Sequence, residues 1–145
     1  MKSILILLLL GVSLCYNAGA AVSYAKKYCK TYNKEYPSFN GDCSNFVSQC
    51  LNAGGMNLLD CDNVRNVNGK GTFGSITTLK RCLTKKGWKS SNTRPKAFKA
   101  GYPMFRGNTH TIIATYVSAD KILYCGHTKD VCDGELKGDV TYYYL

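Results

Sequence analysis

A cysteine at the predicted start of a helix is the residue of this sequence best placed for nucleophilic chemistry. Cys43 follows Asp42 and opens a stretch in which apolar residues recur at the spacing of one helix face. These residues are Cys43, Phe46, Val47, Cys50 and Leu51. Because Asp is a good N-cap, we expect Cys43 in the first helical turn, where free backbone N–H groups and the positive end of the helix dipole favour the thiolate. The thiolate is the nucleophilic form, so Cys43 is a candidate catalytic residue.

The beginning of the chain has the pattern of a secretory signal peptide. The run Ile4 to Leu14 is almost entirely apolar but too short to span a bilayer as a helix, which favours cleavage over anchoring. Small residues permit cleavage after Cys15 or after Ala20. We therefore predict a signal peptide over 1–15, with 20 as the alternative end. The mature protein is then a single secreted, extracellular domain of residues 16–145 without stable membrane insertion.

The cysteine count separates Cys43 from cysteines with a structural role. The chain has 8 cysteines, and either cleavage removes Cys15 and leaves an odd number. An odd number in a secreted chain leaves one thiol free or paired between chains. Cys43 could be one more disulfide cysteine, but its place at a helix start favours it as the sole free thiol, with the other six in three disulfides. Cys125 and Cys132 flank a short loop and can pair, while the remaining connectivity stays open.

A cysteine nucleophile needs a base, and the chain has two histidines, His110 and His127. Alternation along 109–117 puts His110 and Ile112 on one apolar face, which we expect to pack on the helices. A two-residue turn at Ser118-Ala119 would pair position 110 with position 127, and a slip of one residue would make them diagonal neighbours. One ring can then take the thiol proton while the other holds it in the right orientation.

Two other interpretations of these histidines compete with catalysis. A histidine on a strand is often a hydrogen-bonded core residue, but here both histidines of the chain converge on one place, which favours function. A zinc site is disfavoured because the sequence has no His-Glu-x-x-His and no close Cys-x-x-Cys pair. We therefore expect no metal and no cofactor.

The order of elements predicts an α+β fold, with helices packed on a C-terminal antiparallel sheet. Helices are expected over 17–32, from Cys43 to Gly54-Gly55, and from Ser75 to Gly87. Strands are expected over 102–105, 109–117, 121–125 and 140–145. Residues 56–74 and 89–99 have the composition of a long loop and a basic connector.

Positive charge is concentrated in the middle of the chain. The formal net charge is +10, and residues 63–119 contain 11 basic residues and no acidic ones. Such a surface attracts anionic polymers, which for a secreted protein means bacterial envelope polymers, anionic membrane or nucleic acid. The alternative is a basic face that only interacts with solvent. No nucleic-acid-binding motif accompanies the charge, so nucleic acid is not expected as a partner.

Several motifs resemble the NlpC-type papain-like amidases that cut peptidoglycan peptides. They are Asp42-Cys43-Ser44 before a helix, Gly87-Trp88 after a later helix, and a strand that opens with His110. Further stretches resemble a bacterial amidase branch of that superfamily: Tyr24-Ala25, Tyr36-Pro37, Asp42 to Cys50, Ala53-Gly54-Gly55 and Gly126-His127-Thr128. With the signal peptide, small size and Cys43–His110 spacing, the chain also resembles the domesticated amidase effectors of ticks, which derive from type VI secretion amidase effectors of family two.

This resemblance implies a papain-like fold and a role for each candidate residue. Cys43 would be the nucleophile, His110 the general base and acid, and His127 the orienting residue. The Cys43 N–H would be one oxyanion donor, with Tyr36 or Asn40 as candidates for the second. The substrate would be bacterial peptidoglycan, cut at the D-alanyl–diaminopimelate cross-link, whereas related amidases cut the γ-D-glutamyl–diaminopimelate bond.

The chain is thus expected to be a monomeric, secreted antibacterial amidase. A catalytically silent cationic protein that coats bacterial walls is one alternative, and a papain-like protease of ordinary peptides is another.

Overall fold

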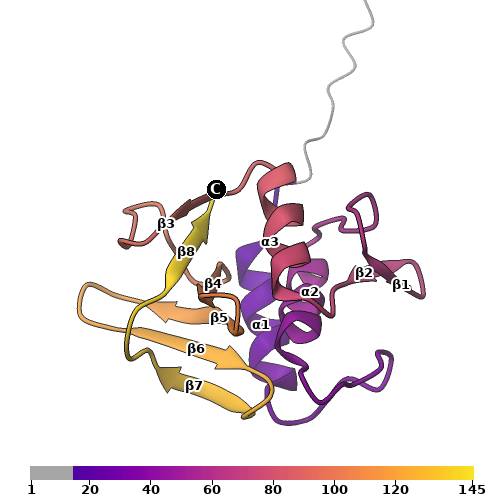
Figure 1. Cartoon of the computed structure of the whole chain (residues 1–145). Helices are drawn as coiled ribbons and strands as arrows, with labels where there is room; N and C mark the ends of the chain where they lie inside the picture. Colours follow the sequence, from indigo (N-terminus) through magenta and orange to yellow (C-terminus); the bar gives the residue numbers. More distant parts are fainter. Residues whose placement is uncertain (1–14) are drawn as a thin grey trace, which may run out of the picture.

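The helices come before the six strands of the larger sheet, as predicted for an α+β protein (Figure 1). The computed structural model describes residues 15–145. The helices are α1 (Ala18–Tyr28), α2 (Cys43–Ala53) and α3 (Ile76–Lys85). The strands are β1 (Arg65–Val67), β2 (Lys70–Thr72), β3 (Lys89–Ser91), β4 (Pro103–Arg106), β5 (His110–Val117), β6 (Ile122–Gly126), β7 (Val131–Glu135) and β8 (Thr141–Tyr144). The helices lie together beside the larger sheet, so the fold has a helical layer and a sheet layer.

The first helix starts and ends at specific contacts. Asn17 caps α1, because its Oδ1 accepts a hydrogen bond from the backbone N–H of Ala20 at 2.9 Å. Ala21 and Ala25 are fully buried, and their small size lets α1 approach its neighbours closely. The helix ends at Tyr28, earlier than the predicted residue 32, because the Tyr28 carbonyl bonds to a side chain elsewhere in the chain.

The second helix is the centre of the fold. Nine of its residues, from Cys43 to Leu51, are buried, so it is covered on all sides. It ends at the predicted glycine pair, where Gly55 has φ +86° and can take the left-handed conformation without a Cβ clash. The third helix buries Leu79, Cys82 and Leu83 as predicted and leaves its basic side chains on the outside.

The larger sheet has the strand order β3-β8-β4-β5-β6-β7, and every pairing in it is antiparallel. Val117 pairs with Ile122, so the loop between β5 and β6 is longer than the two residues predicted. Ile113 lies opposite Cys125, and a bulge follows after Ala114. The predicted pairing of position 110 with position 127 is therefore wrong by one residue, because the longer loop shifts the register by two residues and the bulge takes one of them back.

The face of β5 that packs on the helices is also opposite to the predicted one. Thr115 donates a hydrogen bond to Asp133 at 2.5 Å, and Asp133 forms an ion pair with α1. Ile113 pairs with Cys125, which neighbours Cys50 of α2, so Ile113 faces the helices, and alternation turns Ile112 and His110 away from them. Both isoleucines are fully buried, so both faces of β5 are covered at this point. Hydrophobicity alone therefore does not distinguish the two faces.

A small hairpin of β1 and β2 lies in the region predicted to be a loop. Its turn is Asn68-Gly69, with φ angles of 49° and 78°, which is the backbone of a type I′ turn. The short strands β3 and β7 were also not predicted, since β3 lies in the basic connector and β7 in a segment with turn residues. All four are short, and β1, β3 and β7 consist of exposed or half-buried residues, whereas β2 buries Gly71 and Thr72.

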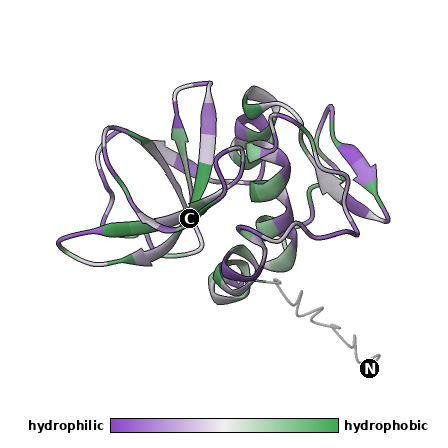
Figure 2. Cartoon of the chain, turned by 90° about the horizontal axis from the view of Figure 1, so that it is seen from below, coloured by the Kyte–Doolittle hydropathy of each residue, from purple (hydrophilic) through white to green (hydrophobic). Residues whose placement is uncertain are grey.

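The hydrophobic core lies between the two layers, and Figure 2 shows hydrophobic segments on both the helices and the strands. Phe46 and Leu51 of α2 are fully buried in it, as are Phe105 of β4 and Ile113 of β5. Phe73, just after β2, joins the same cluster. This core fixes the position of α2 against β5, which matters because the candidate nucleophile opens α2.

Of the two disulfides, one joins the end of α1 to β7 and the other joins the loop after α2 to α3, and neither was predicted as a pair. Cys29 bonds to Cys132, and Cys61 bonds to Cys82, each with Cα atoms 5.4 Å apart. The suggested pairing of Cys125 with Cys132 is therefore wrong, because Cys132 faces the end of α1. In the chain-entropy view, closing loops with separations of 103 and 21 residues stabilises the fold by about 4.7 and about 3 kcal/mol.

Cys43 is not the sole free thiol of the domain, which corrects a second prediction. Cys50 and Cys125 are also unpaired and are buried in the core. Burial raises the pKa of both thiols, and the neighbouring Cys125 raises that of Cys50 further. Buried thiols of raised pKa are unreactive, so these two behave as small apolar core residues.

The predicted signal peptide lies almost entirely outside the described residues. Residue 16, by contrast, is built into the fold: the Tyr16 hydroxyl donates to the Gly101 carbonyl at 2.6 Å, and its ring packs edge-on against Trp88. Cleavage after Ala20 would remove these contacts, whereas cleavage after Cys15 would keep them. Within residues 15–145, no helix is both long enough and apolar enough to cross a membrane.

Candidate active site

The first turn of α2 presents a cysteine next to free backbone donors. Cys43 is the first residue of α2 and is 6 % exposed. Asp42 precedes it as predicted, but its carboxylate makes no capping hydrogen bond to the helix. The N–H groups of a first helical turn have no partner within the helix. They therefore remain available beside the Cys43 thiol.

The Asp42 carboxylate is instead used to fix the loop that leads into α2. Its Oδ1 accepts hydrogen bonds from the backbone N–H of Phe39 at 3.0 Å and from Asn45 Nδ2 at 2.9 Å. Asn45 Nδ2 also donates to the carbonyl of Pro37 at 2.8 Å. Asp42 is almost fully buried, so these bonds replace its contacts with water. The loop from Pro37 to Asp42 thus has one fixed conformation.

His127 holds the second oxygen of this carboxylate. Its Nδ1 lies 2.5 Å from Asp42 Oδ2, and its Nε2 lies 2.7 Å from the backbone carbonyl of Tyr28. The ring is stacked between Tyr32 and Phe46, with both centroids 3.9 Å away. With 1 % exposure, His127 has no contact with solvent and no unoccupied ring nitrogen.

His110 has a different environment at the start of β5. It is half-buried and lies opposite Arg106 of β4. Burial lowers the pKa of His110, and the positive charges of Arg106 and Lys129 lower it further. Its Nε2 lies 3.7 Å from the position that a Cβ on Gly126 would occupy, so the ring rests over a residue without a side chain. A neutral imidazole at pH 7 can accept a proton.

Gly126 and His127 at the end of β6 contact the surroundings of the other two predicted site residues from opposite faces of the strand. His127 contacts the residue before Cys43, and Gly126, directly before His127, contacts the His110 ring. Within residues 15–145 no hydrogen bond joins Cys43 Sγ to either histidine, and none joins the two histidines to each other. His127 therefore orients Asp42 in this structure rather than His110.

The two side chains suggested as a second oxyanion donor have different surroundings. Tyr36 is buried and lines a hollow of about 350 Å³ with Tyr24 and Gln49, where the Tyr24 hydroxyl donates to Gln49 Oε1 at 2.7 Å. Asn40 is exposed in the loop before Asp42. The N–H groups of the first turn of α2 are donors directly beside Cys43, whereas within the described chain no hydrogen bond connects either side chain to it.

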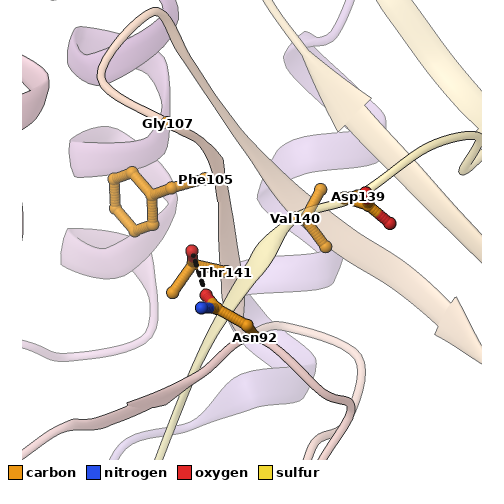
Figure 3. A pocket seen from close by; sticks show the side chains of 6 residues that line it. All are labelled: Asn92, Phe105, Gly107, Asp139, Val140 and Thr141. Atoms are coloured by element: carbon orange, nitrogen blue, oxygen red, sulfur yellow. Dashed lines mark hydrogen bonds between the residues drawn. The ribbon is translucent and has the colours of Figure 1, made fainter.

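A separate hollow lies at the turn between β4 and β5, near the start of the His110 strand (Figure 3). It has a volume of about 440 Å³ and is lined by Asn92, Phe105, Gly107, Asp139, Val140 and Thr141. Thr141 donates a hydrogen bond to Asn92 Oδ1 at 2.9 Å, so part of its lining is rigid. Neither Cys43 nor either histidine lines it, and we assign it no catalytic role.

Comparison with known proteins defines the class to which this fold and site belong. Residues 15–143 match the family described as "Putative amidase domain", which is nearly the whole described chain. The chain therefore belongs to this amidase family, whose reaction class is hydrolysis.

One stretch of the chain is 48 % identical over 40 residues to the uncharacterized protein YhbB of Bacillus subtilis (strain 168). That stretch is 28 % of this chain and 13 % of YhbB, so the chain matches only a small part of its relative. No solved structure matches the chain.

Proposed function

We propose that this protein is a secreted cysteine amidase that hydrolyses stem-peptide bonds of bacterial peptidoglycan, at the D-alanyl–diaminopimelate cross-link. One observation carries the proposal: the first turn of α2 keeps its backbone N–H groups free beside Cys43, because the Asp42 carboxylate binds elsewhere. Membership of an amidase family and the likeness to NlpC-type papain-like enzymes support the same reaction. The γ-D-glutamyl–diaminopimelate bond is the alternative target.

The proposed reaction proceeds through a thioester. Neutral His110 takes the proton of Cys43, and the thiolate attacks the carbonyl carbon of the scissile amide. The free N–H groups of α2 stabilise the oxyanion that forms. His110 returns the proton to the leaving amine, and the acyl group stays on Cys43. Water, deprotonated by His110, then releases the acid and restores the thiol.

Proton transfer requires that His110 reach Cys43 directly or through one water. Cys43 adjoins Asp42, which binds His127, whereas the His110 ring lies over Gly126 on the other face of the strand, so the proposed transfer passes through a water around the start of β5. The lowered pKa of His110 keeps it neutral at pH 7 and supports its role as the base. Turnover should therefore fall on acidification with a midpoint below the ordinary histidine value of about 6.5.

Purified sacculi test the reaction and the bond together. We expect the wild-type protein to release cross-link fragments that mass spectrometry identifies by their new termini. His110→Ala should reduce turnover by about 10²–10⁴-fold. It should also remove the acid limb of the pH profile. Release of γ-D-glutamyl fragments would change the assigned bond, and intact sacculi would contradict the proposal.

A catalytically silent wall-binding protein is the second candidate, because no hydrogen bond joins Cys43 to a histidine in the described chain. A thiol-alkylation experiment separates the two functions. An enzyme should be modified at Cys43 alone, and faster than a free thiol at neutral pH, whereas a silent binding protein should react slowly or not at all.

The basic stretch supports the proposed attraction to anionic walls. Lys85 and Lys86 are poor choices for testing it, because both bind the loop at Asp60. Lys89 and Lys96 are exposed and form no ion pair within residues 15–145, so they report surface charge alone.

We expect Lys89→Glu with Lys96→Glu to weaken binding to intact cells and to spare hydrolysis of soluble fragments. The same change at Lys30 and Lys34, two exposed lysines outside the stretch, is the matched control. Binding should also fall as salt shortens the Debye length below about 8 Å. Salt-independent binding would indicate specific recognition of the glycan or peptide instead.

A further inference from the structure

The ring of His127 faces a hydrogen-bond acceptor on each side. The Tyr28 carbonyl can only accept, so Nε2 must carry a proton. On the other side Nδ1 meets Asp42 Oδ2 at 2.5 Å. This contact needs a proton as well, which resides either on the ring or on the carboxyl group.

The rest of the Asp42 environment decides where that proton lies. The other carboxylate oxygen accepts two N–H groups, from Phe39 and from Asn45. Hydrogen bonds donated to a carboxyl group favour its ionised form. An ionised Asp42 leaves Nδ1 as the donor, which makes His127 an imidazolium with both N–H groups bonded.

The ring faces suit a cation as well. Tyr32 stacks on one side at an interplanar angle of 8°, and Phe46 on the other at 20°. The negative faces of aromatic rings attract a cation, most strongly where water is excluded. The ionisable groups around His127 are Asp42 from the start of α2, Tyr32 from the segment after α1, and Asp130, which accepts the Tyr32 hydroxyl at 2.7 Å. Both acidic groups favour the charged ring.

We propose that His127 is a buried imidazolium that positions Asp42 and the first turn of α2, and that it never takes the Cys43 proton. With both N–H groups donated, it has no lone pair for a thiol or for the N–H of His110. The two histidines therefore divide the work: His127 is a positioning residue and His110 is the base. The positioning of Cys43 rests on the proposed function, whereas the protonation state does not.

The imidazolium also explains why the helix start stays free. Asp42 stands where an acidic side chain ordinarily caps the helix. His127 donates to Oδ2, and Phe39 and Asn45 donate to Oδ1. Both carboxylate oxygens are therefore bonded to groups other than the N–H groups of the helix. The cation thus keeps the Asp42 side chain from filling the place that a substrate oxyanion needs.

Nitrogen NMR of the intact, ¹⁵N-labelled protein tests the protonation state directly. At neutral pH we expect two protonated ring nitrogens for His127 and only one for His110, which serves as the internal control. A neutral tautomer at His127 would overturn the proposal.

Asp42→Asn is the matched variant, since it keeps the shape and removes the charge. In it we expect His127 to lose its second proton at neutral pH, a change that a purely space-filling histidine would not show. If both ring nitrogens of His127 stayed protonated in Asp42→Asn, the ionised Asp42 would not stabilise the imidazolium, and the proposal would be overturned.

The kinetic arm separates positioning from proton transfer. In His127→Gln we expect slower alkylation of Cys43 with an unchanged pH midpoint, whereas His110→Ala should abolish the midpoint. A folded His127→Gln protein that lost the midpoint would overturn the division of roles. Sacculi left intact by a protein whose His127 is doubly protonated would contradict the proposed function alone.

Discussion

The starts of α1 and α2 use similar residues in opposite ways. Asn17 before α1 turns its side chain into the helix and bonds to the N–H of Ala20. Asp42 before α2 turns its side chain out, to His127 and the preceding loop, and makes no capping bond. At α1 the polar side chain stabilises the helix, whereas at α2 the first N–H groups stay free beside the Cys43 thiol. Free helix ends are costly, so we interpret the open one as the functional one.

The largest effect expected at the open start is on chemistry alone. Cys43→Ala should reduce hydrolysis of sacculi to the uncatalysed level, because the nucleophile is lost. The free energy of unfolding should change by about 1 kcal/mol or less, since one buried atom and no disulfide is removed. Activity assays and urea unfolding measure the two effects. Retained activity with lower stability would make Cys43 a structural residue.

Removing the carboxylate at the open start should affect both properties. Asp42→Ala leaves the buried charge of His127 without a partner, and breaking a buried ion pair in this way costs about 3–5 kcal/mol. Turnover should fall as well, because the loop before Cys43 loses its anchor. Urea unfolding at neutral pH is the measurement. If Asp42→Ala lowered the free energy of unfolding no more than Asn17→Ala does, the two helix starts would not differ in stability.

At the capped start the expected effect is on stability alone. Asn17→Ala removes the side-chain bond to Ala20 and should cost about 1 kcal/mol. The backbone bond from Asn17 N–H to the Gly54 carbonyl remains. Turnover per folded molecule should be unchanged, because α1 begins far along the chain from Cys43 and makes no contact with the histidine rings through Asn17. A loss of turnover in this variant would connect the two helix starts.

The smallest expected effect comes from placing the acidic residue at the capped start. Asn17→Asp has no histidine to bind there, so the carboxylate should cap α1 and interact favourably with its dipole. The gain should be about 0.3–1 kcal/mol and should shrink with added salt. Thermal unfolding at two salt concentrations checks it. Destabilisation would mean that the surroundings of α1, not the presence of a histidine, decide how an acidic residue is used.

The sequence predicted the helices well because their signals are local. Asp42 before an apolar stripe and Gly54-Gly55 after it mark both ends of α2. The Asn68-Gly69 pair carried an equally local signal for the β1–β2 hairpin, since a type I′ turn requires positive φ at both positions. The hairpin was nevertheless not predicted, because the strands on either side of this turn have only three residues each and lack a run of apolar residues.

The candidate site divides in the same way between local and distant contacts. Cys43 and its helix start follow from neighbouring residues. The bond between Asp42 and His127 spans 85 residues, and the Tyr28 carbonyl that fixes the other ring nitrogen is 99 residues from it. No periodicity connects such positions, so the sequence identified His127 as important without revealing its partner. The register error had a similar cause, because a bulge and a longer loop are decided by packing.

The Cys29–Cys132 bond also determines what a protease can do to this protein. Cys43, His110 and His127 all lie between the two bonded cysteines, whose separation is 103 residues. A single cut anywhere in that span leaves one covalent molecule, with both pieces still joined at the bond. We predict that mild digestion yields one band on a denaturing gel without reductant and two with it. A protein nicked once in an exposed loop would thus keep all three site residues together until the bond is reduced.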